Sequence, residues 1–209
     1  MTAPSAQRTR GIITLAVSTL GFAAALALRN QLDPWRTTAL AALVGSLLSA
    51  WTLGPRLRGL FAVTSRGLVT AVALGVALVT ATHAGFALVR LAAPAFALTI
   101  SSLYLSIDVG ANRLALVALT ALIVVGEELV WRGVAVELAN RRAKLAAGGI
   151  SVALYVLPQL PGHVPVLIAA ATGLGAVLAA QRLRTGRLTD SIVTHAIWSV
   201  AVFVVFPVS

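Results

Sequence analysis

The sequence predicts an all-α fold: a polytopic bundle of transmembrane helices that forms one membrane domain over residues 1–209. Composition is the first observation, because the chain is 59% hydrophobic and 11% charged, whereas soluble domains carry about 25% charged residues. A soluble fold of this length could not hide so much apolar surface, but a membrane bundle exposes it to lipid. The second observation is a series of apolar runs of roughly membrane-crossing length.

Three of these runs occupy the first half of the chain. Residues 11–28 resemble a signal peptide, but their apolar core is longer than the ~7–15 residues usual there, so we expect an uncleaved first span. Residues 37–54 form the second run, which ends at Pro55 because proline interrupts a helix. Residues 67–89 form the third run and end at Arg90.

Four more runs follow, over residues 113–139, 145–157, 164–180 and 191–206. The second of them is short, and we expect Pro158 to stop it. In the third, small residues at Ala171, Gly175 and Ala179 recur at i, i+4 and predict a close approach by another helix. For the last helix, Thr189 or Asp190 is the expected N-cap.

The stretch 91–107 is apolar, but it contains Pro94 and is barely long enough to cross a bilayer. The positive-inside rule favours a bundle of about seven spans with a cytoplasmic N-terminus, in which this stretch is interfacial or re-entrant. The inside segments then hold Arg8, Arg10, Arg56, Arg58, Arg66, Arg141, Arg142, Lys144, Arg182, Arg184 and Arg187, and the outside ones Arg29, Arg36, Arg90 and Arg113. A crossing by 91–107 would remove this bias.

Charge and cysteine content limit the partners. A net charge of +10 would suggest nucleic acid in a soluble chain, but here the basic residues lie between apolar runs, without interleaved aromatic residues. We therefore expect the lipid bilayer, in a multi-pass cell-membrane protein, and no nucleic acid. The absence of cysteine excludes disulfides and thiolate metal sites.

Three ionisable residues, Glu127, Glu128 and Arg132, lie inside the apolar run 113–139. Each costs about 2.5–3.5 kcal/mol at the centre of a membrane helix unless it is paired. Glu128 and Arg132 are spaced i, i+4 and can neutralise one another, whereas Glu127 points about 100° away and is left as a candidate general base. A packing ion pair, with Glu127 near the water interface, is the alternative.

The pattern of these residues resembles a known family. Glu127, Glu128, Trp131, Arg132 and Gly133 reproduce the motif Glu-Glu-x-x-x-Arg, with an aromatic residue before the arginine and a glycine after it. This motif is similar to that of the CAAX prenyl endopeptidase and bacteriocin-processing group (CPBP, Abi) of intramembrane proteases. The resemblance extends over residues 114–202 and implies a catalytic core at about 111–206.

The family's second motif is an aromatic residue followed four residues later by histidine. Tyr155 fits the aromatic position, but Gln159 occupies the histidine position. Glutamine can hydrogen-bond a catalytic water but cannot take up its proton. His163 is the alternative, although Pro161 and Gly162 should break the helix and direct it toward the outer surface.

The third motif is a histidine followed four residues later by asparagine or a similar polar residue, and His195 and Ser199 match it on one helix face. The resemblance implies that they stabilise the oxyanion formed on the attacked carbonyl. The implied catalytic set is Glu127, Glu128, Arg132, Gln159, His195 and Ser199, with His163 as the alternative.

The resemblance therefore predicts an endopeptidase that hydrolyses a membrane-associated peptide or lipidated protein with a glutamate-activated water. We expect no cofactor; zinc is the less favoured alternative, because the second motif lacks its histidine. Two other functions remain open: an inactive family member that acts as a membrane scaffold, and an unrelated transporter component that uses the acidic pair as an ion relay.

Overall fold

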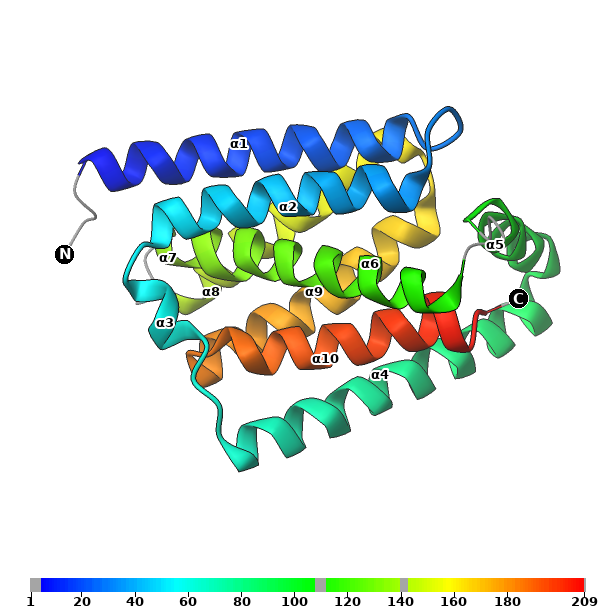
Figure 1. The fold of residues 1–209 in the computed structure, drawn as a ribbon. Helices are drawn as coiled ribbons and strands as arrows, with labels where there is room; N and C mark the ends of the chain where they lie inside the picture. The colour runs from blue at the N-terminus through cyan, green and yellow to red at the C-terminus, as the bar shows by residue number, and fades with distance from the viewer. Residues whose placement is uncertain (1–4, 108–111, 140–142, 209) are drawn as a thin grey trace.

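The computed structural model describes residues 5–107, 112–139 and 143–208, and every regular element within these ranges is helical (Figure 1). The predicted all-α fold is therefore confirmed. The first half of the chain forms α1 (Ser5–Ala27), α2 (Pro34–Leu53), α3 (Arg56–Leu60), α4 (Ser65–Ala92) and α5 (Pro94–Ile107). The side chain of Asp33 caps α2 by accepting hydrogen bonds from the backbone N–H groups of Trp35 and Arg36.

The second half forms α6 (Arg113–Glu127), η1 (Glu128–Val134), α7 (Ala135–Leu138), α8 (Lys144–Val156), η2 (Leu157–Gly162), α9 (Pro165–Thr185), α10 (Leu188–Val200) and η3 (Ala201–Val205). The elements α6, η1 and α7 follow one another without a break, and η1 is a π-helical segment. In Figure 1 the long helices α1, α2, α6 and α10 run along a common direction.

One predicted helix boundary was right and another was wrong. The regular helix α8 ends at Val156, just before Pro158 as expected, and the chain continues as the 3₁₀ helix η2 to Gly162; proline fits the first turn of a helix, where its missing N–H needs no partner. The N-cap of α10 is Arg187, not Thr189 or Asp190, and its side chain makes no capping hydrogen bond. Asp190 lies in the first turn of α10, where a negative charge is favourable.

Within the described residues, six helices are long and apolar enough to cross a membrane: Ser5–Ala27, Ser65–Ala92, Arg113–Leu138, Lys144–Gly162, Pro165–Thr185 and Leu188–Val205. The helix α2 is not among them, although it packs against both α1 and α6. The predicted helix over 37–54 therefore exists, while its crossing, and with it the count of seven spans, stays a prediction.

The helix α5 crosses one end of the bundle. It has 14 residues, which span about 21 Å at 1.5 Å per residue, less than the ~30 Å of a bilayer core. Figure 1 shows it nearly end-on while the long helices run across the view. Its Ile100 and Tyr104 pack into a cluster with Leu174 and Trp198. This placement suits the interfacial helix that we expected.

The basic residues gather at the other end of the bundle, where α1, α4 and α10 begin and α9 ends (Figure 1). Among the described residues this end holds Arg8, Arg10, Arg56, Arg58, Arg66, Lys144, Arg184 and Arg187, and the opposite end holds Arg29, Arg36, Arg90 and Arg113. Arg141 and Arg142 lie outside the described residues. The charge asymmetry is present, and the cytoplasmic N-terminus inferred from it stays a prediction.

Close helix contacts surround the acidic pair. A Cβ on Gly126 would lie 2.5 Å from the carbonyl oxygen of Ala42, so the backbones of α6 and α2 touch there. A Cβ on Gly175 would lie 3.0 Å from the ring of Tyr155 and 3.4 Å from Nη2 of Arg132. The close approach predicted for the small residues of α9 is therefore confirmed at Gly175.

Candidate active site

The candidate site lies where the regular helix α6 gives way to the π-helical segment η1. Glu127 is the last residue of α6 and Glu128 the first of η1, and all side chains from Glu127 to Val134 are buried. Single π-helical turns are rare and are frequently found at functional sites. The π-helical segment coincides with the Glu-Glu-x-x-x-Arg motif, and the sequence pattern did not predict it.

Glu128 and Arg132 form a fully buried ion pair. Arg132 Nη1 lies 3.2 Å from Glu128 Oε1, and both side chains are 0% exposed. The predicted mutual neutralisation of these residues is therefore confirmed. Arg132 Nη2 also donates to the carbonyl oxygen of Gly175 at 3.3 Å. Its guanidinium lies 4.3 Å above the ring of Tyr155, where a cation is attracted to the π-electrons.

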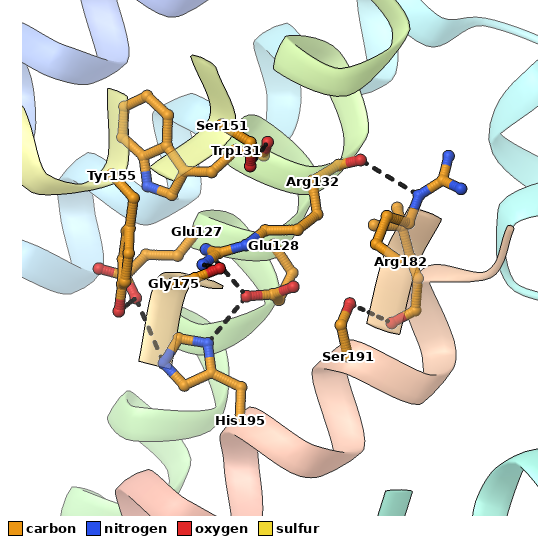
Figure 2. A network of polar contacts seen from close by, with 11 residues as sticks. Glu127, Glu128, Trp131, Arg132, Ser151, Tyr155, Gly175, Arg182, Ser191 and His195 are labelled. Atoms are coloured by element: carbon orange, nitrogen blue, oxygen red, sulfur yellow. Dashed lines mark hydrogen bonds and ion pairs between the residues drawn. The ribbon is translucent and has the colours of Figure 1, made fainter. Parts of the chain in front are cut away.

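His195, on α10, lies between the two glutamates (Figure 2). Its Nδ1 is 3.0 Å from Glu128 Oε1, and its Nε2 is 3.6 Å from Glu127 Oε2. A carboxylate that is paired with an arginine accepts hydrogen bonds, so the tautomer of His195 with the proton on Nδ1 is the one that donates a hydrogen bond to Glu128. In this tautomer Nε2 bears the lone pair and faces Glu127.

Glu127 does not share the ion pair, as expected, but it has two other neighbours. The hydroxyl of Tyr155 donates to Glu127 Oε2 over a long 3.4 Å, and Nε2 of His195 approaches the same oxygen. The rings of Tyr155 and His195 meet edge to face, with centroids 6.2 Å apart. Glu127 is therefore in contact with two rings, and all three side chains line one cavity.

This cavity of about 210 Å³ brings together residues from α1, α2, α6, α8, η2, α9, α10 and η3. Glu127, Tyr155, Gln159, His195 and Ser199 line it on the polar side, and Arg29 and Trp35 line its end near the loop between α1 and α2. The rest of the wall is mainly apolar, with Ile123, Val124, Leu167, Leu174, Trp198 and Phe203. The cavity can thus hold an apolar chain against a few polar groups.

The predicted site residues largely converge here. Glu128, Arg132 and His195 are in direct contact, and Gln159 and Ser199 line the cavity with Glu127. His163, the alternative to Gln159, is exposed, has a left-handed backbone with φ 51°, and does not line the cavity. The geometry therefore favours Gln159 as the residue in the second motif, and the catalytic roles stay predictions.

Arg182 was predicted wrongly as a basic residue of an inside segment, whereas it is a buried residue of α9. Its side chain is 0% exposed, and its Nε donates to the carbonyl oxygen of Arg132 at 3.1 Å (Figure 2). Its Nη2 lies 3.0 Å from Glu137 Oε1. The spacing could have located it, because Arg182 lies seven residues, or about two turns, after Gly175 on the same face of α9.

A metal ion fits these residues poorly. Within the described part of the chain, no three His, Cys, Asp or Glu side chains are grouped to bind one. The oxygen of Glu128 that faces His195 is also the one that contacts Arg132. A guanidinium at that distance competes with any cation for the carboxylate.

Comparison with known families finds a match, and it lies in the C-terminal half of the chain. Residues 109–201 match the family described as Rce1-like, the type II CAAX prenyl endopeptidases. The matched region includes Glu127, Glu128, Arg132, His195 and Ser199. No curated protein matches the chain, and no solved structure does.

Proposed function

Through residues 109–201 the chain belongs to the Rce1-like family of type II CAAX prenyl endopeptidases, and we propose that it is an active endopeptidase that works inside the membrane. It is a multi-pass membrane protein, which we place in the cell membrane. The observation that carries this proposal is the shared cavity of Glu127, Gln159, His195 and Ser199, built from three separate helical segments.

The nucleophile in this mechanism is a water held between Glu127 and His195. The facing atoms, Glu127 Oε2 and His195 Nε2, are 3.6 Å apart, so a water on the cavity side can lie about 2.8 Å from both. As the water attacks the scissile carbonyl carbon, Glu127 takes its proton. When the C–N bond breaks, Glu127 returns that proton to the leaving amine.

Glu128 and Arg132 act on His195 and not on the substrate. The contact between Glu128 Oε1 and Nδ1 of His195 fixes the orientation and the tautomer of the ring. Arg132 keeps Glu128 ionised and therefore acceptor-only. Both are positioning residues, and neither lines the cavity.

The oxyanion requires hydrogen-bond donors on the cavity wall. The Ser199 hydroxyl and the Gln159 amide are both available there. The resemblance implied this role for His195 with Ser199, but both ring nitrogens of His195 face glutamates. We therefore assign water binding to His195 and the oxyanion to Ser199 and Gln159.

The largely apolar wall suits a hydrophobic peptide or a lipidated chain end. The test is hydrolysis of a prenylated and of an unmodified hydrophobic peptide by the purified protein in detergent. We expect Glu127→Gln to lower the rate at least about 100-fold, while Asp33→Asn, an acidic-to-amide control at an exposed position, keeps most of the activity. Equal cleavage by Glu127→Gln and the unsubstituted protein would exclude Glu127 as the base.

The second candidate, a non-catalytic membrane scaffold, is favoured by one observation. Gln159 stands where the family has histidine, and an amide cannot take up a proton. Under this alternative the unsubstituted protein cleaves neither peptide, and Glu127→Gln leaves its biological role intact.

A further inference from the structure

A second cavity lies at the basic end of the bundle, away from the candidate active site. It has a volume of about 450 Å³ and lies between α4 and α9, over the start of α10. Both α4 and α9 pack against α10, but they hardly contact each other. The surface between them is therefore a groove, and in a membrane a groove of this kind is open to lipid.

Three arginines surround the groove: Arg66 from α4, Arg184 from α9, and Arg187 at the start of α10. Arg187 is paired with Asp190, with Nη2 2.8 Å from Oδ2. Arg66 and Arg184 are exposed and form no ion pair with the described residues. Three arginines against one aspartate leave two positive charges in excess, so the groove is complementary to an anion.

A buried amide also faces this groove. Gln181 is 7% exposed and lines the cavity, yet its Oε1 is buried without a hydrogen-bond partner among the described residues. A buried polar atom without a partner destabilises the folded protein. The N–H groups of the same amide are hydrogen-bond donors, from which a phosphate oxygen can accept.

Gly67 leaves room for the Arg187–Asp190 ion pair, which forms the charged floor of the groove. A Cβ at this position would lie 2.5 Å from Nη2 of Arg187 and 2.7 Å from Oδ1 of Asp190. The ion pair can therefore lie directly against α4 because residue 67 has no side chain. Beyond this floor the wall is apolar, with Leu74 of α4 and Val177 and Ala180 of α9.

We infer that this groove binds one anionic phospholipid, with its phosphate among Arg66, Arg184 and Gln181 and an acyl chain along the apolar wall between α4 and α9. Position and chemistry agree, because the arginines lie at the basic end of the bundle, where anionic head groups are attracted. A soluble anion would contact the charged side chains but not the apolar wall of the groove.

The test is a titration of short-chain phosphatidylglycerol or phosphatidylcholine into the purified protein in non-ionic detergent, with bound lipid counted by native mass spectrometry. We expect one tight phosphatidylglycerol and no comparable phosphatidylcholine. The double variant Arg66→Gln/Arg184→Gln should bind about thirtyfold more weakly, since each arginine near an anionic surface contributes ~1 kcal/mol and 1.4 kcal/mol is tenfold.

The matched control is Arg56→Gln/Arg58→Gln, which removes the same charge from the same end of the bundle, on α3 and outside the groove. This control variant should still bind one phosphatidylglycerol tightly. Equal weakening of phosphatidylglycerol binding in both double variants would mean that the arginines act only by general electrostatic attraction, and it would overturn the proposal. So would equal binding of the two lipids, or displacement of phosphatidylglycerol by inorganic phosphate at similar concentration. Thermal unfolding without added lipid should be unchanged in both variants, because all four arginines are exposed.

Discussion

Glu128 Oε1 lies 3.0 Å from Nδ1 of His195, and this contact joins the π-helical segment η1 to α10 in the interior of the bundle. The two residues are separated by 67 positions in the sequence. Since His195 is 2% exposed and Glu128 is 0% exposed, water does not screen the contact. It therefore sets which ring nitrogen faces the cavity.

Arg132→Gln should strongly destabilise the protein. Removal of one partner of a buried ion pair leaves the other charge uncompensated, at a cost of about 3–5 kcal/mol, and both partners here are 0% exposed. The control Arg36→Gln removes an arginine whose side chain is 82% exposed in its pair with Asp33, and it should change stability by less than about 0.5 kcal/mol. Unfolding in detergent compares the two; equal effects would contradict the buried pair.

Tyr155→Phe should lower the rate of hydrolysis modestly without unfolding the protein. The variant keeps the ring beneath Arg132 and beside His195 but removes the 3.4 Å hydrogen bond to Glu127. A hydrogen bond worth about 0.5–1.5 kcal/mol corresponds to a two- to tenfold decrease in kcat. Tyr104→Phe, in a separate buried cluster, should leave kcat unchanged. A similar decrease in both variants would point to packing instead of the hydroxyl.

Gln159→His should raise kcat about tenfold or more, because an imidazole on the cavity wall adds a group that can exchange protons. His163→Ala should have no effect, since that side chain is exposed and outside the cavity. Steady-state hydrolysis distinguishes the two. A loss of activity on substitution of His163, with none gained at residue 159, would reverse the assignment of the second motif.

Chelation should leave hydrolysis unchanged. Arg132 contacts the same Glu128 oxygen that faces His195, which disfavours a cation between them. The measurement is the rate before and after treatment with a strong zinc chelator in detergent. A loss that added zinc restores would show that the glutamate mechanism is wrong.

Gly126→Ala should cost about 1–3 kcal/mol of stability, because the new methyl group would meet the backbone of Ala42 and push α2 from α6. Gly173→Ala is the matched control: nothing lies within 4 Å of a Cβ there, and a helical Gly→Ala change adds about 0.5–1 kcal/mol. Opposite signs for the two substitutions in thermal unfolding would support the close contact, and equal signs would contradict it.

The helices were predictable because apolar runs of bilayer length have few other structures available to them. The 3₁₀ helix that follows α8 was not predictable, because Pro158 can begin a 3₁₀ turn as well as end an α-helix. A helix over 91–107 that does not cross the membrane was expected from Pro94 and the charge asymmetry; α5 is short, as expected, and its interfacial or re-entrant placement stays a prediction. Asp190 is not the N-cap of α10 but forms an ion pair with Arg187. The spacing of these residues alone does not predict which of the two contacts forms.

For the candidate site, the sequence predicted the pair Glu128–Arg132, since i, i+4 residues share a helix face. It placed His195 at the site through the family resemblance alone. The position of His195 between two glutamates, the hydroxyl of Tyr155 and the contact of Arg182 with Arg132 all depend on how α8, α9 and α10 pack around η1. Such contacts join positions far apart in the chain, where local patterns carry no information.

The contact between Arg182 and the Arg132 carbonyl has a consequence for biogenesis. Within lipid, the reactive turn must find its polar partners in the protein itself, and α9 emerges from the ribosome some 50 positions after that turn. The acidic segment is therefore synthesised before the helix that supplies this partner. The proposed site is therefore complete only after α9 and α10 have joined the bundle, because Arg182 and His195 lie on these last two long helices.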